Sequence, residues 1–377
     1  MKTVQLSELC DINPESIAKD YPYDFIEYID ISSVSSGHLA ISPQLLSISE
    51  APSRAKRIVK NEDIIISMVR PNLRSFMFIT NPKENTIVST GFAVLRTKPG
   101  IYPGFVYYAI TDHKFTEYLA NNAIGTSYPA VDTDTILRGE IPNFSYDIQH
   151  KIASILSAYD SLIENNRRRI QLLEHSARLL YREWFIYLRF PGHEHVRIID
   201  GVPEGWEKKS LGGIIEIKKG KNITKETVIN GKVPVVAGGL NPAYFHNKPN
   251  TTGPVITISA SGANAGYVNI YHEDIWASDC SYISEKSTEH IYYYYSLLKS
   301  KQKEIFGLQK GTAQPHVYPK DLMRLSVVSP PDKILGYFSD TTSHAFIMIK
   351  NLITQNKSLI QARDILLPRL MNGEITV

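Results

Sequence analysis

Asn241-Pro242-Ala243-Tyr244 is the segment of this 377-residue chain whose residue types come nearest to a catalytic device. Enzymes that methylate the exocyclic amine of adenine or cytosine use Asn/Asp-Pro-Pro-Tyr/Phe. Its polar side chain and a neighbouring carbonyl bind the amine, while the aromatic ring stacks on the extruded base. Here Ala243 replaces the second proline, and no glycine-rich segment for a methyl donor lies upstream. The string therefore favours a turn after the strand-like residues 233–239, with amine methylation as the alternative.

Other patterns with catalytic potential lack the partners that their chemistry requires. The sequence contains no GxxxxGKS/T phosphate-binding loop, no GxGxxG segment opening a helix and no GxSxG nucleophile elbow. The carboxylate pairs Asp132/Asp134 and Asp274/Asp279 stand in turn-rich segments without histidine partners. We expect these carboxylates to be cap and loop residues and not a nuclease site.

Histidine and cysteine are placed in ways that do not favour a metal site. His193 and His195 stand at i and i+2 in a linker with no further ligand nearby, which is typical of loop residues. The two cysteines, Cys10 and Cys280, are far apart and outside any CxxC pattern. We therefore expect two buried thiols, without a disulfide framework or a structural zinc.

The composition is that of a soluble globular protein with two or three domains. Apolar residues make up 43% of the chain and charged residues 21%, a balance that supports packed cores. The N-terminal residues lack the apolar region of a signal peptide, and no run approaches the roughly 18 apolar residues of a membrane span. We expect a cytoplasmic protein without membrane contact.

Positive charge is clustered along the chain, although the net charge is only +3. A solvated face explains each cluster alone, but clusters in two comparable halves of the chain favour nucleic acid as a partner. The clustered cations are Arg54, Lys56, Arg57, Lys60, Arg70, Arg74, Arg167, Arg168, Arg169, Lys208, Lys209, Lys218, Lys219, Lys221 and Lys225.

The elements that position these residues occur in two copies. GTSYPAVDTDTILRGEIP (125–142) and GTAQPHVYPKDLMRLSVV (311–328) share glycine, threonine, proline and valine at an offset of 186 residues. The same offset sets FVYYA (105–109) against IYYYY (291–295). Strand-like runs rich in β-branched and aromatic residues precede these strings in both halves. The sequence therefore predicts two strand-rich domains, residues 1–148 and 189–330.

A long helix is predicted after each domain. Apolar residues spaced alternately by four and three between 152 and 184, and again between 345 and 371, indicate a coiled-coil seam. Asn166 and Asn356 fill equivalent polar slots, so the helices at 149–188 and 331–377 are expected to pair antiparallel, with a solvent-facing asparagine as the alternative. The residues predicted to pair are Tyr159, Ile163, Asn166, Ile170, Leu173, Ile349, Ile353, Asn356, Ile360 and Leu367.

The assembled pattern resembles the specificity subunit of type I restriction-modification systems over essentially the whole chain. GVPEGWEKKSLGGI (201–214) resembles the entry to the family's second target-recognition domain. LLYREWF (179–185) resembles the end of its central conserved helix, and LLPRLMNGEI (366–375) resembles its C-terminal signature. The family often starts each helix with Gln-x-x-Ile: Gln149 and Ile152 keep this pattern, whereas the second copy lacks the glutamine.

The resemblance implies an α+β fold with two mixed α/β target-recognition domains, joined by two long antiparallel coiled-coil helices in a pseudo-twofold repeat. It implies a non-catalytic subunit that reads a bipartite double-stranded DNA site, one domain per half-site, and docks two methyltransferase subunits and restriction subunits. No cofactor is expected in this chain. S-adenosylmethionine would serve the methyltransferase subunits, and ATP and Mg²⁺ the restriction subunits.

Cations and polar side chains on loops are the groups expected to contact DNA. In the first domain these are Arg54, Lys56, Arg57, Arg70, Asn72, Arg74, Ser127 and Tyr128. In the second they are Lys219, Lys221, Asn222, Ser261, Asn264, Gln314 and His316.

A helix over 152–184 would be about 50 Å long, compared with roughly 34 to 36 Å for one turn of DNA. A coiled-coil scaffold with other ligands is the remaining alternative.

Overall fold

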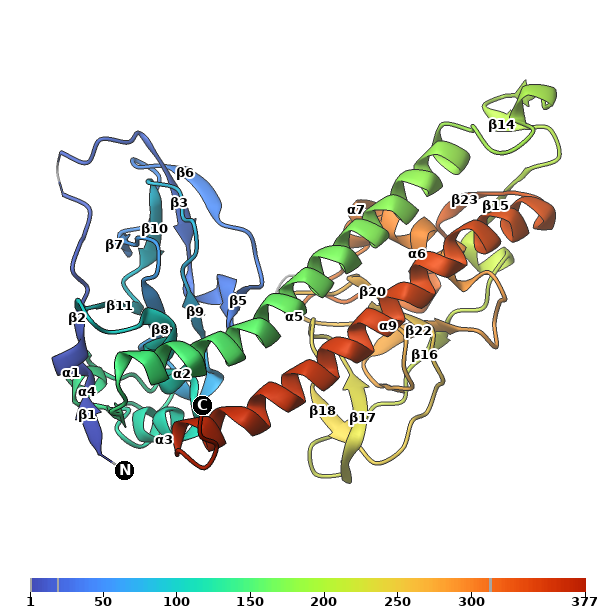
Figure 1. The fold of residues 1–377 in the computed structure, drawn as a ribbon. Helices are drawn as coiled ribbons and strands as arrows, with labels where there is room; N and C mark the ends of the chain where they lie inside the picture. The colour runs from blue at the N-terminus through green and yellow to red at the C-terminus, as the bar shows by residue number, and fades with distance from the viewer. Residues whose placement is uncertain (1, 19, 312–313) are drawn as a thin grey trace. The chain divides into compact units, whose positions relative to one another are not determined.

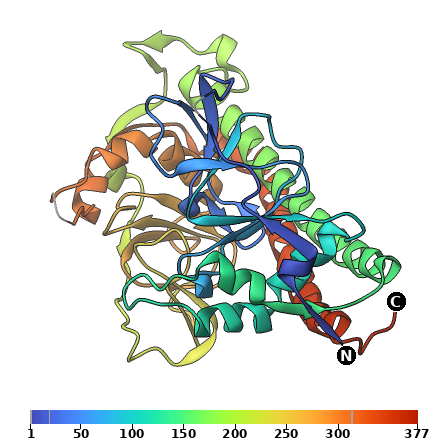
Figure 2. The same ribbon diagram turned by 90° about the vertical axis from the view of Figure 1, so that its left-hand side faces the viewer.

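The computed structural model describes residues 2–18, 20–311 and 314–377 (Figure 1). Thr312 and Ala313, in the second repeated string, lie outside the described residues. The chain divides into two compact units: unit 1 is Met1–Glu164 with Asn356–Val377, and unit 2 is Asn165–Gln355. Both chain ends, marked N and C in Figure 2, therefore belong to unit 1.

Within the described residues, unit 1 contains two four-stranded sheets and two short strand pairs, one of which joins β4 (Val34–Ser35) to β5 (His38–Leu39). The first sheet has the order β2 (Cys10–Ile12), β11 (Phe92–Thr97), β8 (Ile64–Ser67), β9 (Phe76–Phe78). The second has the order β6 (Gln44–Ser47), β3 (Phe25–Ile29), β10 (Thr86–Ser89), β7 (Ala55–Ile58). β1 (Thr3–Gln5) pairs antiparallel with β12 (Glu140–Pro142). The helices are α1 (Leu6–Leu9), α2 (Pro103–Thr111), α3 (His113–Asn121) and α4 (Thr133–Arg138).

The strands of unit 1 form where β-branched residues are buried. All four residues of β8 and all four of β10 are buried, including the polar Ser67, Thr86 and Ser89. The strand-like run over residues 87–97 comprises parts of two strands in different sheets. Gly91 lies in the turn between them, where a Cβ atom would stand 2.0 Å from Ile31 Cδ1.

Unit 2 repeats the arrangement. Its first sheet has the order β16 (Lys218–Lys219), β22 (Cys280–Ser284), β19 (Val255–Ser259), β20 (Val268–Tyr271). The second has the order β18 (Tyr244–His246), β17 (Asn230–Val236), β21 (Trp276–Ala277). β15 (Glu207–Ser210) pairs antiparallel with β23 (Ser326–Ser329). The helices are α6 (Ile291–Ser300), α7 (Gln302–Phe306) and α8 (Pro319–Leu322).

The two units share most of their topology, although the second sheet has four strands in unit 1 and three in unit 2. Each has an antiparallel four-stranded sheet entered from a short helical turn, a second sheet with one parallel pair, and a helix pair before the repeated string. The parallel pairs are β3 with β10 in unit 1 and β17 with β21 in unit 2. This correspondence confirms the predicted mixed α and β composition in two internal copies.

Two long helices contribute to both units. α5 spans Tyr146–Tyr181 and continues as a π-helical turn over Arg182–Ile186, while α9 spans Asp332–Met371. In unit 1, Ile152 and Leu156 of α5 and Leu370 of α9 belong to the same core as Phe105 of α2. In unit 2, the later part of α5 and the earlier part of α9 pack with α6 in the core that contains Tyr181, Phe338, Phe346 and Tyr293. Each buried aromatic or leucine contributes about 1.5 to 3 kcal/mol to this packing.

The helices pair antiparallel in each unit taken separately. In unit 1, Arg363 Nη1 donates to Asp160 Oδ1 at 2.6 Å, and Asn356 Nδ2 donates to the Ile163 carbonyl at 3.2 Å. In unit 2, Asn166 Nδ2 donates to Gln355 Oε1 at 3.0 Å. Asn166 and Asn356 are 4% and 9% exposed, so the alternative of solvent-facing asparagines is wrong.

The other predicted pairing residues are at least half-buried. Ile163, Ile349 and Leu367 are buried, and Tyr159, Ile170, Leu173, Ile353 and Ile360 are half-buried. A buried asparagine in such a seam favours the register in which its amide is paired, because an unpaired amide would lose its hydrogen bonds to water. The amide contacts of Asn166 and Asn356 satisfy this requirement within their own units.

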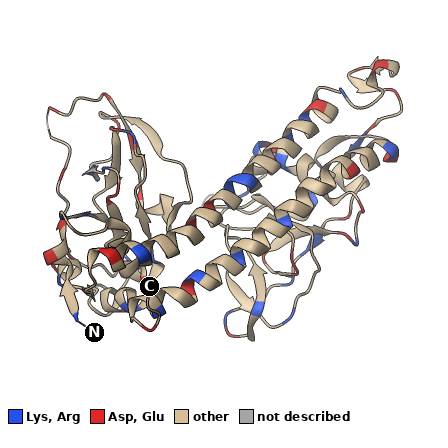
Figure 3. Ribbon diagram, in the orientation of Figure 1, with Lys and Arg blue, Asp and Glu red and all other residues tan. Residues whose placement is uncertain are grey.

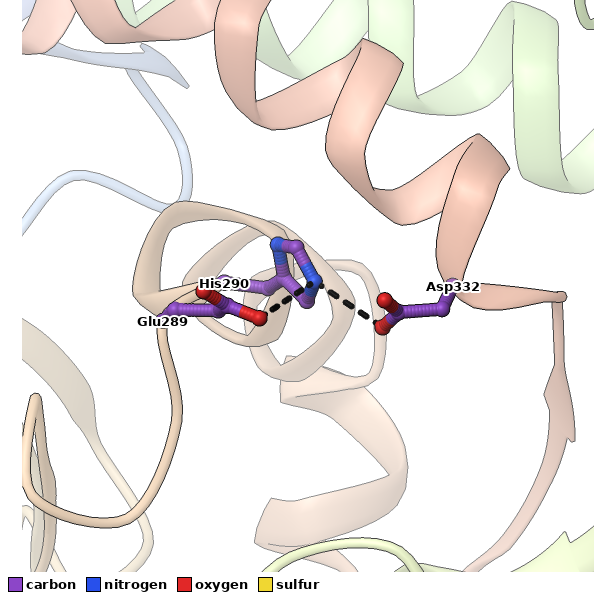
Figure 4. Close-up of side chains that lie close together, drawn as sticks. All are labelled: Glu289, His290 and Asp332. Carbon is purple, nitrogen blue, oxygen red and sulfur yellow. Dashed lines mark hydrogen bonds and ion pairs between the residues drawn. The ribbon is translucent and has the colours of Figure 1, made fainter.

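Gln149 and His290 attach the two long helices to their units in different ways. In unit 1, Gln149 Oε1 accepts from the backbone N–H of Tyr102, the residue before α2, and Gln149 Nε2 donates to the Phe144 carbonyl, both at 2.9 Å. In unit 2, the residue before α6 is His290, whose Nε2 lies 3.2 Å from Asp332 Oδ1 at the start of α9 (Figure 4). The second helix therefore lacks the glutamine but retains a side-chain link at its start.

Glu289, His290 and Asp332 are residue types that can bind a metal ion, but in this cluster their contacts attach α9 to unit 2. Figure 4 shows the imidazole between the two carboxylates, which lie 3.9 Å and 3.2 Å from Nε2. The other ring nitrogen, Nδ1, lies 2.9 Å from Ser339 Oγ on α9. Because both ring nitrogens already contact α9, we interpret the cluster as a structural link.

Candidate nucleic-acid interface

In both repeated strings, the residues that flank the loop are joined by the same pair of backbone hydrogen bonds. In unit 1, Ile124 and Ala130 exchange both backbone hydrogen bonds, at 2.8 and 2.9 Å, and so close the loop over residues 125–129. In unit 2, Lys310 and His316 exchange the same pair of bonds, both at 2.9 Å. Gly125 and Gly311 begin the loops with φ values of +112° and +94°, a conformation that favours glycine. The shared glycine is therefore framework, as the repeat suggested.

A second segment pairs with each loop in the same register. In unit 1, the N–H of Val131 donates to the Met68 carbonyl, and the N–H of Arg70 donates to the Pro129 carbonyl. In unit 2, the N–H of Val317 donates to the Ala260 carbonyl, and the N–H of Gly262 donates to the Pro315 carbonyl. Residues 68–70 thus correspond to residues 260–262.

The loop of unit 1 carries a cation stacked on an aromatic ring. The guanidinium carbon of Arg70 lies 4.3 Å from the ring centroid of Tyr128, and Arg70 Nη2 donates to the Ser127 carbonyl at 2.9 Å. Tyr128 is 69% exposed, so the stack lies at the surface. Arg70 itself has a left-handed backbone (φ 50°, ψ 60°), which costs about 1 to 2 kcal/mol for a residue with a Cβ atom. The structure therefore brings together three of the predicted residues.

The loop of unit 2 carries different side chains on the same frame. Gln314 is exposed, and the His316 ring stacks on Tyr318 with centroids 6.0 Å apart and an interplanar angle of 17°. Lys310 Nζ donates to Asp321 Oδ2 at 2.8 Å, and this bond holds the pKa of Asp321 below its usual range. Ser261 pairs with His316 and donates through its hydroxyl to Asp279.

Comparison with known proteins identifies the protein family of the two domains that carry these loops. The family model described as "Type I restriction modification DNA specificity domain" matches residues 1–175 and 203–359, one match over each copy. The chain belongs to the specificity-subunit family of type I restriction-modification systems.

Relatives of this specificity subunit match along most of its length. The MjaIX specificity subunit of Methanocaldococcus jannaschii is 29% identical, over 80% of this chain and 75% of the relative. The HindI specificity subunit of Haemophilus influenzae is 23% identical, over 94% and 96% of the two chains. The crystal structure of the type I S subunit from M. genitalium is similar in fold, with a TM-score of 0.54, 20% identity and coverage of 98% and 96%.

The remaining residues predicted for the first domain of the specificity subunit lie in two places. Asn72 is exposed on the turn after Arg70, whereas Arg74 is half-buried and donates to the Thr111 carbonyl and to Thr116 Oγ1. Arg54, Lys56 and Arg57 lie on or next to β7, in the other sheet. Arg54 pairs with Asp30 at 2.9 Å, and burial lowers the pKa of the Arg57 guanidinium. Arg74 and Arg57 thus contact their own domain.

Predicted residues of the second domain are also divided between surface and framework. Lys219, Lys221 and Asn222 are exposed at and after β16, but the Lys221 carbonyl accepts from Trp276 Nε1, and Asn222 Oδ1 accepts from Ser278 Oγ. Asn264 is half-buried, and its carbonyl accepts the N–H of Tyr267 in the turn after Gly262. These contacts fix the loop backbone and leave the lysine side chains at the surface.

Residues proposed as caps, turns or inert thiols have these places in the structure. Asn241–Ala243 lies in the connection between β17 and β18, where the Ala243 N–H donates to the Val235 carbonyl, and Tyr244 begins β18. Asp132 caps α4 by accepting from the Thr135 N–H at 2.7 Å. Both cysteines are free and buried, and burial raises their pKa to about 12. His193 and His195 lie in an exposed turn beside Glu194.

Charge is distributed over helices as well as loops. Figure 3 shows Lys and Arg along both α5 and α9, interspersed with Asp and Glu. The Arg167 to Arg169 run lies within α5, so this cluster belongs to a helix and not to a recognition loop. Among the residues that the structure describes, no helix is both long and apolar enough to cross a membrane.

Gly262 is the residue of the second loop frame that sequence reasoning missed. It occupies the position of Arg70, yet the two segments match at a different offset, 192 residues, from the 186 of the repeated strings. The signal was available as a glycine in the string SASGANAG, but only the hydrogen bond to Pro315 places it opposite the loop.

Proposed function

We propose that this specificity subunit reads a bipartite sequence in double-stranded DNA, with one target-recognition domain for each half-site. The observation that carries the proposal is the pair of loops at residues 124–130 and 310–316. Their backbones are closed by the same hydrogen bonds, while Ser127 and Tyr128 of one loop differ from the side chains of the other. A fixed frame with variable side chains suits two readers of different half-sites.

We further propose that the long helices dock two methyltransferase subunits, with which restriction subunits then associate. Solvent-exposed apolar side chains on these helices support this proposal, because such side chains favour a protein partner when they form a patch. On the unit 1 parts of the helices they are Ile155, Leu162 and Ile365; on the unit 2 parts they are Leu172, Leu179, Ile347 and Met348.

In this proposal the chain itself carries no active site or cofactor. S-adenosylmethionine would be bound by the methyltransferase subunits, and ATP and Mg²⁺ by the restriction subunits. The position of Asn241–Tyr244 supports a non-catalytic chain, since the segment leads from the connection after β17 into β18. Lack of S-adenosylmethionine binding by the purified chain would agree with this assignment, and stoichiometric binding would contradict it.

Methylome mapping tests the reading function directly. Cells that express the chain with its methyltransferase subunits should methylate one bipartite motif with two half-sites and an unread spacer of fixed length. Mobility-shift assays on that motif should show affinity that falls steeply with salt, because Lys and Arg contacts release counterions from phosphate. A contiguous motif, or no sequence preference, would contradict the proposal.

A further inference from the structure

Position 70 in unit 1 and position 262 in unit 2 are the same point of the recognition frame. Each residue donates its backbone N–H to the carbonyl of the repeated proline, Pro129 at 2.7 Å and Pro315 at 3.0 Å. Each has a left-handed backbone, with φ of 50° at Arg70 and 79° at Gly262. Glycine adopts this conformation without strain, whereas arginine does not. The two domains thus differ by one side chain at a position where a side chain is disfavoured.

The arginine is held in its strained conformation by its neighbours. The Tyr128 ring stacks on the guanidinium, and the Ser127 carbonyl accepts from Nη2. Strained residues of this kind persist where the surrounding structure determines them, and they concentrate at functional sites. Stacking on a ring also fixes the plane of the guanidinium and so reduces the entropy lost when it binds a partner.

Most of the donors of Arg70 remain available. A guanidinium has five N–H donors, and one is used by the Ser127 carbonyl. Within the described ranges, no other side chain or backbone group accepts a hydrogen bond from this guanidinium. Tyr128 is exposed, so the stacked pair faces solvent and not the core. A planar donor group that is oriented and unpaired matches the O6 and N7 acceptors of guanine, the commonest base contact of arginine.

We infer that Arg70, oriented by Tyr128, is a specificity-determining residue that contacts a guanine in the half-site read by the first domain. The inference rests on the proposed reading function and adds to it one residue and one base. In the second domain the same position is Gly262, and a Cβ atom there would meet nothing within 4 Å. The second domain therefore has open space where the first has a guanidinium, and it reads its half-site without this contact.

The structure suggests a substitution that tests the side chain of Arg70 without changing the loop backbone. Arg70→Gly places at position 70 the residue that unit 2 already carries in the same backbone conformation, so the loop is expected to fold. Arg70→Lys keeps the positive charge but removes the planar donor pair. Gly262→Ala is the matched control, because it changes the equivalent position of the other domain. Each variant is expressed as the full chain with its methyltransferase subunits, and the methylome is mapped.

The expected result is loss of preference at a single guanine in one half-site, by roughly 5- to 150-fold, in both Arg70 variants. Gly262→Ala should leave that half-site unchanged. Binding is then measured on duplexes that carry the wild-type motif or a substitution at that guanine.

Two results would overturn the inference and leave the reading function intact. One is a weaker but unchanged motif for Arg70→Gly, with a salt slope smaller by about one, which would make Arg70 a phosphate contact. The other is an unchanged guanine preference in Arg70→Lys, which would exclude planar recognition. If the wild-type chain yields no bipartite motif, the reading function fails, and the inference that rests on it fails with it.

Discussion

His272 is a buried residue whose chemistry the fold does not use. It follows β20 and is 8% exposed, and both of its ring nitrogens lack a hydrogen-bond partner within the described part of the chain. Its ring packs against Tyr292 and Phe346, each with centroids 6.2 Å away. Burial, together with the nearby Lys350, lowers the pKa of this imidazole from 6.5 to about 4. The folded state therefore favours the neutral form of the His272 imidazole.

We predict that unit 2 loses stability as the pH falls from 6.5 toward 4 because of His272. The unfolded chain binds the proton more tightly in this window, so the contribution is fully present above pH 6.5 and lost as the pH approaches 4. The complete loss is about 3 kcal/mol, converted at 1.36 kcal/mol per pKa unit.

Tryptophan fluorescence during urea unfolding measures this effect in unit 2, because Trp184, Trp206 and Trp276, the three tryptophans of the chain, all belong to that unit. In His272→Leu the difference in unfolding free energy between pH 7.5 and pH 5 should shrink by about 2 kcal/mol. His195→Gln, which removes an exposed imidazole, is the control. An equal acid sensitivity of wild type and His272→Leu would refute the assignment.

At the scale of elements, a charged network fixes the helix pair in unit 1. Asp160 of α5 accepts from Tyr108 on α2 at 2.7 Å and from Arg363 on α9 at 2.6 Å. Burial raises the pKa of Tyr108, and the Asp160 carboxylate raises it further, so the phenol stays protonated and donates. Arg363 is a polar residue in the apolar seam, and it joins α9 to α5 in unit 1.

We predict that Arg363→Met destabilises unit 1 by about 1 to 3 kcal/mol, because the half-buried Asp160 then lacks its cationic hydrogen-bond donor. Amide hydrogen exchange should accelerate in residues 146–164 and 356–371, with residues of unit 2 as an internal reference. Arg369→Met is the matched control, since Arg369 is 54% exposed and pairs with Glu374 at 3.5 Å. Adding Asp160→Asn should recover part of the loss, and an additive loss would contradict the pairing.

Sequence patterns predicted the elements better than the contacts between them. The four-and-three spacing of residues such as Ile163 and Ile349 is a local property, so it predicted long helices with a buried seam. The contact of Arg70 with Tyr128 joins residues 58 positions apart through a left-handed backbone, and no local period encodes it. The His290 link to Asp332 likewise depends on the tertiary approach of α6 and α9. Long-range side-chain contacts therefore needed the structure.

At the scale of the whole molecule, unit 1 is completed by a segment distant in sequence. Residues 356–377 belong to unit 1, where Leu367, Leu370 and Met371 are buried in the core formed by residues 6–156. We predict that truncation after Gln355 exposes this core and destabilises unit 1, while the tryptophan fluorescence of unit 2 keeps its urea midpoint. Limited proteolysis should then cleave within residues 2–164. Persistent protection of those residues would show that the C-terminal segment is dispensable.

We also propose that the length of the long helices sets the length of the unread DNA spacer, so that longer helices give a longer spacer. Glu164 and Asn356 both lie at the boundaries of the units, so a seven-residue insertion after Glu164 and another after Gln355 lengthen both helices together. Seven residues preserve the phase of the seam. The added rise of about 10 Å corresponds to at most about three base pairs of DNA.

The methylome of this double-insertion chain should contain both original half-sites with a longer spacer, because neither recognition loop is altered. A chain with the insertion in α5 alone is the matched control. It shifts the partners of residues such as Asn166 by one heptad without lengthening α9, and it should lose methylation. A double-insertion chain that methylates the original motif with its original spacer would exclude the helices as the ruler, and the loops would then have to set the spacing themselves.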